Sequence, residues 1–144
     1  MRTHKHSLRG LLIAGLLGAL PIATALAQDA PKPAVVKPLL TESVTGLRGK
    51  EVTMSTVEYL PGGESLPHRH DAEVFVYVLE GSVVMQVDGQ EPVTLLPGQT
   101  FHERPSDIHR VSKNASATEP AKFLVFMLKD KGKPATRAAD DKRR

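Results

Sequence analysis

The sequence predicts an all-β fold, in the form of a single sandwich or barrel of short strands. Short apolar runs rich in β-branched and aromatic side chains follow one another closely, and turn residues such as Pro61-Gly62-Gly63 and Asp88-Gly89 separate them. None of these runs has a helical period. With 144 residues, one domain is the natural expectation. The expected strands are 51–60, 74–79, 83–87, 93–96, 100–103, 108–112 and 122–128.

Residues 1–27 have the pattern of a secretory signal peptide. A positively charged start precedes an apolar run from Leu11 to Leu20, which is too short to span a bilayer. Ala25-Leu26-Ala27 then supplies the small residues of a cleavage site. We expect a periplasmic or secreted protein with no stable membrane insertion after cleavage, and an uncleaved membrane anchor is the alternative.

The mature chain divides into three parts. Residues 28–40 hold three prolines without periodicity and are expected to form an extended linker. Residues 41–128 hold the expected strands of the barrel. Residues 129–144 are rich in Lys, Asp, Gly, Pro and Ala, and are expected to be a disordered basic tail.

The distribution of charge argues against a nucleic-acid partner, although the sequence pI is about 9.3. The excess of basic residues lies at the two ends, and residues 28–128 carry nine basic and thirteen acidic side chains, a net charge of −4. Contact of the basic tail with an anionic surface is the alternative to a solvated end. The sequence has no cysteine, which excludes disulfides, thiolate metal sites and a cysteine nucleophile.

The run 74–79 is apolar on both faces of the expected strand. One face can form the barrel interior, so the other must be covered as well. A homodimer that buries this second face is one expectation, and coverage by the N-terminal segment of the same chain is the other.

The histidines after residue 27 are His68, His70, His102 and His109. Side chains alternate along a strand, so His68 and His70 face the same side and can share one metal ion. His109, at the start of another apolar run, could supply a third ligand from a different strand. Taken alone, an H-x-H pair on a strand is often incidental.

The surrounding residues resemble the two motifs of the cupin family. Gly62, five residues, His68-Arg69-His70 and the closing Gly81 resemble the first motif, and the stretch from Gly98 to His109 resembles the second. The resemblance extends from about residue 52 to 128 and implies a double-stranded β-helix, or jelly-roll, barrel. It also implies a divalent transition metal, such as Fe, Mn, Zn, Ni or Cu, held by histidines and a glutamate.

The sequence departs from these motifs at several positions. The ligand glutamate of the family would fall at position 74, which is Val74, whereas Glu73 lies one residue earlier and on the opposite face of a regular strand. Glu73 would reach the metal only through a bulge or at the strand entry. In the second motif Arg104, Ser106 and Lys113 replace the usual proline, glycine and asparagine. The candidate metal ligands are therefore His68, His70, His109 and Glu73.

His102 has three interpretations: a fourth ligand, an acid or base in the pocket, or a surface residue. The neighbouring Glu103 could orient its ring. The sequence assigns no catalytic residue.

Three functions are compatible with these features. The first is a metal-dependent enzyme, an oxygenase or isomerase acting on a small organic molecule, because a three-histidine site leaves coordination positions open. The second is a non-catalytic cupin that binds a small molecule or a metal. The third is a structural barrel whose site has decayed. The expected partner is a small, partly apolar ligand, because valine and aromatic side chains dominate the predicted interior.

Overall fold

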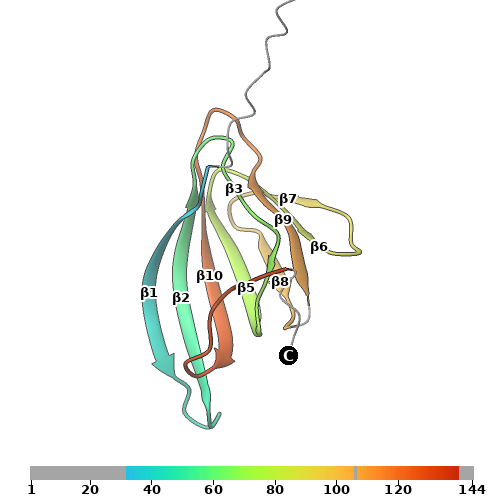
Figure 1. The fold of residues 1–144 in the computed structure, drawn as a ribbon. Coiled ribbons are helices and arrows are strands. Elements are labelled where there is room, and N and C mark those ends of the chain that lie inside the picture. Colours follow the sequence, from blue (N-terminus) through green and yellow to red (C-terminus); the bar gives the residue numbers. More distant parts are fainter. Residues whose placement is uncertain (1–31, 106, 140–144) are drawn as a thin grey trace, which may run out of the picture.

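A computed structural model describes residues 32–105 and 107–139 (Figure 1). All of the regular secondary structure in these ranges is β-strand, so the predicted all-β class is confirmed. The strands are β1 (Val35–Ser43), β2 (Lys50–Tyr59), β3 (Glu64–Ser65), β4 (His68–Arg69), β5 (Ala72–Glu80), β6 (Val83–Val87), β7 (Val93–Leu95), β8 (Thr100–Glu103), β9 (Ile108–Asn114), β10 (Ala121–Asp130) and β11 (Arg137–Ala138).

The strands form two antiparallel sheets. The first sheet has the order β1-β2-β10-β5-β8, and the second has the order β11-β4-β9-β6-β7 with β3 also paired to β9. Several strands that are neighbours in the chain, such as β5 and β6, lie in different sheets, so the chain crosses repeatedly between the two sheets. This arrangement brings β4, β8 and β9 close together, and these three strands or their ends carry the histidines and Glu103.

Each expected strand is present, but the expected boundaries of the barrel are wrong at both ends. Strand β1 begins at Val35, inside the expected linker, and pairs with β2 along its whole length. Prolines did not prevent this pairing because β1 is an edge strand, where an amide hydrogen is dispensable. Strand β10 continues to Asp130, and β11 lies within the expected tail.

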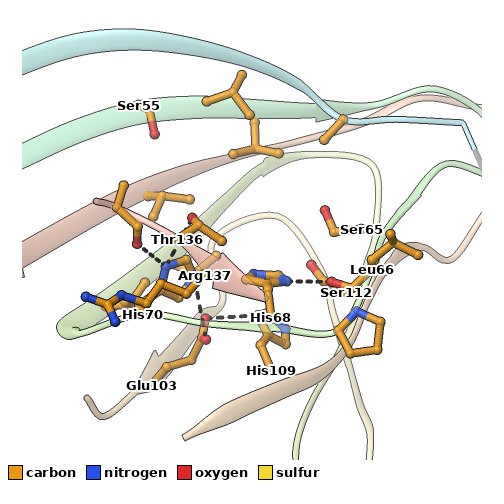
Figure 2. A pocket seen from close by; sticks show the side chains of 18 of the residues that line it. Ser55, Ser65, Leu66, His68, His70, Glu103, His109, Ser112, Thr136 and Arg137 are labelled. Carbon is orange, nitrogen blue, oxygen red and sulfur yellow. Dashed lines mark hydrogen bonds and ion pairs between the residues drawn. The ribbon is translucent and has the colours of Figure 1, made fainter. Parts of the chain in front are cut away.

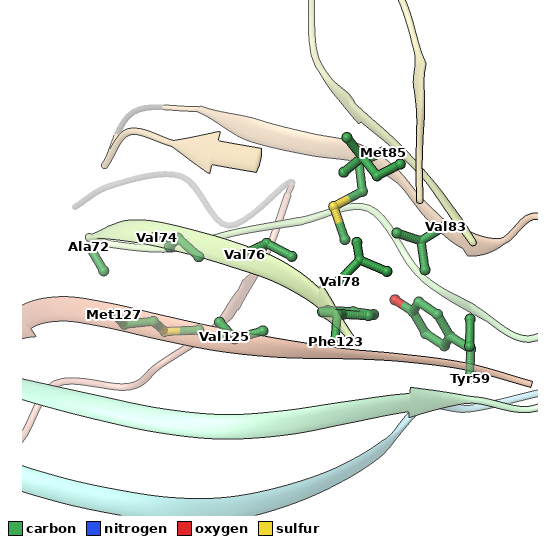
Figure 3. Close-up of a cluster of buried hydrophobic side chains, with 12 residues drawn as sticks. Tyr59, Ala72, Val74, Val76, Val78, Val83, Met85, Phe123, Val125 and Met127 are labelled. Carbon is green, nitrogen blue, oxygen red and sulfur yellow. The ribbon is translucent and has the colours of Figure 1, made fainter. Parts of the chain in front are cut away.

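The core lies between the two sheets (Figure 3). On β5 the residues at even positions from Ala72 to Val78 are buried and those at odd positions face outward or are only partly buried, as the pleat of a strand requires. The other sheet contributes Val83 and Met85, both with 0% of their surface exposed. Tyr59 closes one end of this core, where its ring packs against Phe123 with the ring centroids 5.5 Å apart.

Gly81 makes the tight connection from β5 to β6. Its φ is +69°, and a Cβ atom at this position would lie 2.4 Å from the carbonyl oxygen of Pro120. Only glycine fits this position without displacing the backbone.

The outward face of β5 remains exposed in the described part of the chain. Phe75, Tyr77 and Leu79 are 47%, 45% and 38% exposed. Strand β1 does not cover them, because it lies at the far edge of the same sheet. Coverage by a second copy stays a prediction.

The predicted signal peptide, residues 1–27, lies outside the described residues. Within the described ranges, no helix is present that is long and apolar enough to cross a membrane.

Candidate metal centre

The fold brings His68, His70 and His109 together (Figure 2). His68 on β4 is the direct register partner of His109 on β9, and His70 follows β4 on the same side. One ligand atom from each ring lies within 4.8 Å of the other two. His70 and His109 are buried, and His68 is partly buried.

Two of the rings use Nδ1 to bind a backbone carbonyl. The Nδ1 of His68 lies 2.7 Å from the oxygen of Leu66, and the Nδ1 of His70 lies 2.6 Å from the oxygen of Ala135. A carbonyl oxygen only accepts, so each Nδ1 carries the proton and donates it. The Nε2 lone pairs of both rings are therefore available to a metal ion.

His109 is oriented by a carboxylate. Its Nδ1 lies 3.1 Å from Oε1 of Glu103, and its Nε2 is buried with no hydrogen-bond partner among the described residues. A buried nitrogen without a partner is costly in a folded protein unless a ligand satisfies it. A carboxylate, a histidine and a metal in series is the usual arrangement that fixes the tautomer of a ligating ring.

Glu103 is also buried, with 2% of its surface exposed. Its second oxygen, Oε2, lies 3.9 Å from Nε2 of His70 and has no hydrogen-bond partner in the described ranges. Burial alone would raise the pKa of Glu103, but the hydrogen bond from His109 and the electrostatic effect of the three neighbouring histidines outweigh burial and lower this pKa below its usual value. Glu103 is thus a carboxylate with one free oxygen beside the three rings.

The electrostatics favour the neutral form of His68. Burial lowers the pKa of His68, and the neighbouring His70 and His109 lower it further, against the raising effect of the Leu66 carbonyl. Neutral imidazole is the form that binds a metal.

The donor set fits a divalent transition metal. Three imidazole nitrogens and a carboxylate oxygen suit zinc, iron, manganese, nickel or copper. The fit is supported by the buried unpartnered atoms, His109 Nε2 and Glu103 Oε2, which lie on two of the four side chains.

Glu73 and His102 do not join this group. Glu73 is 41% exposed in its side chain, and its Oε2 pairs with Nε2 of His102 at 2.7 Å. The ring of His102 stacks on Phe75 with centroids 4.8 Å apart, on the outward face of β5 and β8. The β5 strand keeps a regular alternation at Glu73, without the bulge that would turn this side chain inward.

The sequence reasoning assigned Glu103 only a role in orienting His102, and missed its contacts with His109 and His70. The period of a strand could have revealed them. Phe101 is an apolar residue that packs against the core and stacks on His109 with centroids 5.8 Å apart. Two residues further along β8, Glu103 must face the same side.

A cavity of about 1090 Å³ adjoins the histidines. Its walls are mostly apolar, with side chains from β2, β5 and β10 such as Val57, Val76 and Phe123. At one side the Tyr59 hydroxyl forms hydrogen bonds of 2.7 Å with both Ser65 and Ser112. Residues 135–139 form part of the wall beside His70.

Several solved structures have a similar fold. It is similar to a cupin-2 domain protein from Rhodospirillum rubrum, with a TM-score of 0.59, 22% sequence identity, and coverage of 79% of this chain and 71% of that chain. It is also similar to an oxalate oxidase in complex with the substrate analogue glycolate, with a TM-score of 0.59, 22% identity, and coverage of 77% and 57%. A third similar structure is the DMSP lyase DddQ from Ruegeria pomeroyi, with a TM-score of 0.54, 19% identity, and coverage of 65% and 45%.

The chain spans about half the length of these two enzymes, and at such identities the likeness concerns the fold alone. No protein with a curated description matches the sequence. The cupin domain family does match, over residues 55–127, a range that includes all three histidines and Glu103. This chain is therefore a member of the cupin family.

Proposed function

We propose that this protein is an exported cupin that binds one divalent transition metal through His68, His70 and His109, with Glu103 as the carboxylate of the site. The observation that carries the proposal is the hydrogen bonding of the three imidazole rings. Nδ1 of each ring has a nearby acceptor, which leaves Nε2 of each ring for the ion. Export is supported by the signal-like pattern of residues 1–27.

The cavity favours a small ligand that is largely apolar and uncharged or weakly anionic. Its described walls carry one cationic side chain other than the histidines, Arg137, and this guanidinium forms an ion pair with Asp71 at 3.1 Å. Glu64 and Glu103 add negative charge to the walls. Beyond the proposed ion, a small dianion would find no unpaired cationic side chain on these described walls to bind a second charged group, whereas an apolar body with one coordinating oxygen would fit.

A metal-dependent reaction, an oxygenation or isomerisation, is the activity we propose for this site. A bound ion would supply a Lewis acid or a redox centre at the cavity wall. The chain's own contribution is to orient three rings, to hold a carboxylate beside them, and to exclude water with valine and phenylalanine side chains.

The metal content of the protein, expressed without a histidine tag and measured by elemental analysis, tests the proposal. We expect about one equivalent of metal in the wild type and a large loss in His68→Ala and His109→Ala. His102→Ala is the matched control, because His102 lies on the outer face and should leave metal content unchanged. Negligible metal in the wild type, or equal loss in His102→Ala, would contradict the proposed site.

The second candidate is a non-catalytic binding protein that uses the same ion. The size and apolar walls of the cavity favour it, because they can retain a ligand without further acid or base groups. Oxygen uptake or product formation on a panel of small apolar substrates would support the enzyme. Tight ligand retention without turnover would support the binding protein instead.

A further inference from the structure

The segment after β10 crosses from one sheet to the other (Figure 1), and its strand β11 pairs with β4, where Ala138 lies opposite His68. We call residues 131–139 the C-terminal strap. The strap lies beyond the region that matches the cupin family, which ends at residue 127. It belongs to the part of the sequence that composition predicts to be a disordered tail, yet it has defined contacts at its beginning, middle and end.

The beginning of the strap is held by a buried lysine. Lys129 forms an ion pair with Glu51 and also donates to the carbonyl oxygen of Lys133 at 2.7 Å. The amide of Gly132 donates to the same Glu51 carboxylate at 3.2 Å. These contacts turn the chain back toward the cavity immediately after β10.

The end of the strap is held by β4. Ala138 is the register partner of His68, and Arg137 is the register partner of Arg69. The Arg137 guanidinium pairs with Asp71 at 3.1 Å, and the amide of Ala139 donates to the Pro67 carbonyl at 3.3 Å. The strap therefore extends the sheet that carries two of the three histidines.

Between these two anchors the strap contacts His70. The carbonyl oxygen of Ala135 lies 2.6 Å from Nδ1 of His70, and the Thr136 hydroxyl oxygen lies 3.4 Å from the same nitrogen (Figure 2). The carbonyl holds the proton on Nδ1 and leaves Nε2 facing Glu103. The same strap residues form the cavity wall next to this ring.

We propose that the C-terminal strap is a positioning element of the site, which fixes the Nδ1–H tautomer and the orientation of His70 through the Ala135 carbonyl. The inference rests on the proposed function in one respect, since the oriented Nε2 is taken to be a metal ligand. None of the contacts that hold the strap uses the Nε2 atoms proposed to bind the metal. The tautomer can therefore be tested separately from metal binding.

The experiment uses the full-length, metal-free chain. Two-dimensional ¹⁵N–¹H spectra of the imidazole rings at about pH 8 report the tautomer of His70. A His70→Gln spectrum assigns the signal. We expect the Nδ1–H tautomer in the wild type, and an Nε2–H tautomer or an even mixture would overturn the proposal.

Charge reversal then releases the end of the strap. Arg137→Asp places two carboxylates together at Asp71, and the matched control Arg110→Asp does the same at Asp88, an exposed pair at 2.9 Å on the β6–β9 side. We expect Arg137→Asp to lose the single His70 tautomer, and Arg110→Asp to keep it. The exchanged pair Asp71→Arg/Arg137→Asp should restore the wild-type spectrum. An unchanged His70 signal in Arg137→Asp would contradict the proposal.

Titration with Co²⁺, followed by visible absorption, connects the strap to the metal. We expect Arg137→Asp to weaken Co²⁺ binding about ten-fold or more, and Arg110→Asp to stay within two-fold of the wild type. Equal affinities in the two variants would remove the strap from the metal site. Absence of Co²⁺ binding in every protein, the wild type included, would refute the proposed function, and the tautomer spectra would still decide the role of the strap.

Discussion

Replacing Glu103 with glutamine tests the central feature of the site, the buried carboxylate. Glutamine has nearly the same shape but carries no charge, so the variant removes the anionic acceptor of His109 Nδ1 and the free Oε2 next to His70. Loss of a partner that orients a ligating histidine typically weakens metal binding by roughly 10- to 100-fold. This corresponds to about 1.4 to 2.8 kcal/mol, since each factor of ten is about 1.4 kcal/mol.

The structure places Glu103→Gln at the upper end of this range. The carboxylate is almost fully buried, so water cannot replace it, and it contacts two of the three rings. The glutamine amide could also turn its NH₂ group toward the ion, which would add repulsion to the loss of charge.

The assay is competition for Zn²⁺ against a chromophoric chelator at pH 7.5, with Glu73→Gln as the matched control. Glu73 is the carboxylate closest in sequence to Val74, the position where the family motif expects the ligand glutamate. It lies on the outer face with His102, so its substitution should change affinity by less than two-fold. This reasoning would be refuted if the Zn²⁺ affinity of Glu103→Gln stayed within two-fold of the wild type. It would also be refuted if Glu73→Gln lost as much Zn²⁺ affinity as Glu103→Gln.

Three further predictions concern the barrel that holds the site. Met85→Ala should lower the free energy of unfolding by about 2 to 5 kcal/mol in urea titrations, because it opens a cavity in the buried core. Gly81→Ala should destabilise by more than about 1 kcal/mol, because φ is +69° and the new methyl group would overlap the Pro120 carbonyl. The hydrogen bond from Lys129 lowers the pKa of Glu51 below its usual 4.5. Ionised Glu51 therefore stabilises the fold above pH 4.5, and this stabilisation is lost as the pH falls through the lowered pKa. Lys129→Met should therefore reduce the acid dependence of the urea midpoint between pH 3 and 7, and an unchanged dependence would contradict this role.

The strands and the pairing of His68 with His70 on one face were predictable because both follow from local periodicity. A strand alternates with a period of two, so His68 and His70 had to face one side, and the glycine and proline residues marked where each strand ends. The partner of His68, His109, required a second motif, because no local rule pairs residues 41 positions apart.

Periodicity along β8 predicts the face on which Glu103 lies, but it does not predict which residues Glu103 contacts there. Val74, the position where the family motif expects the glutamate, is the direct register partner of Glu103 on the neighbouring strand β8. The carboxylate therefore reaches the same region of the barrel interior from the next strand. Register between β5 and β8 depends on the long connection between them, and sequence reasoning had no means to fix it.

The sequence gives the number of charged residues in each part of the chain, but not the contacts that these residues make. The composition of residues 129–144 predicts a solvated tail, with contact to an anionic surface as the alternative. In the structure Lys129 pairs with Glu51 and Arg137 pairs with Asp71, so basic residues of the end meet acidic residues of the body. Complementary charge between a compact domain and an adjoining segment is thus compatible with docking as well as with solvation. The choice depends on whether the paired groups are buried, as Lys129 and Glu51 are here, because exposed pairs contribute little.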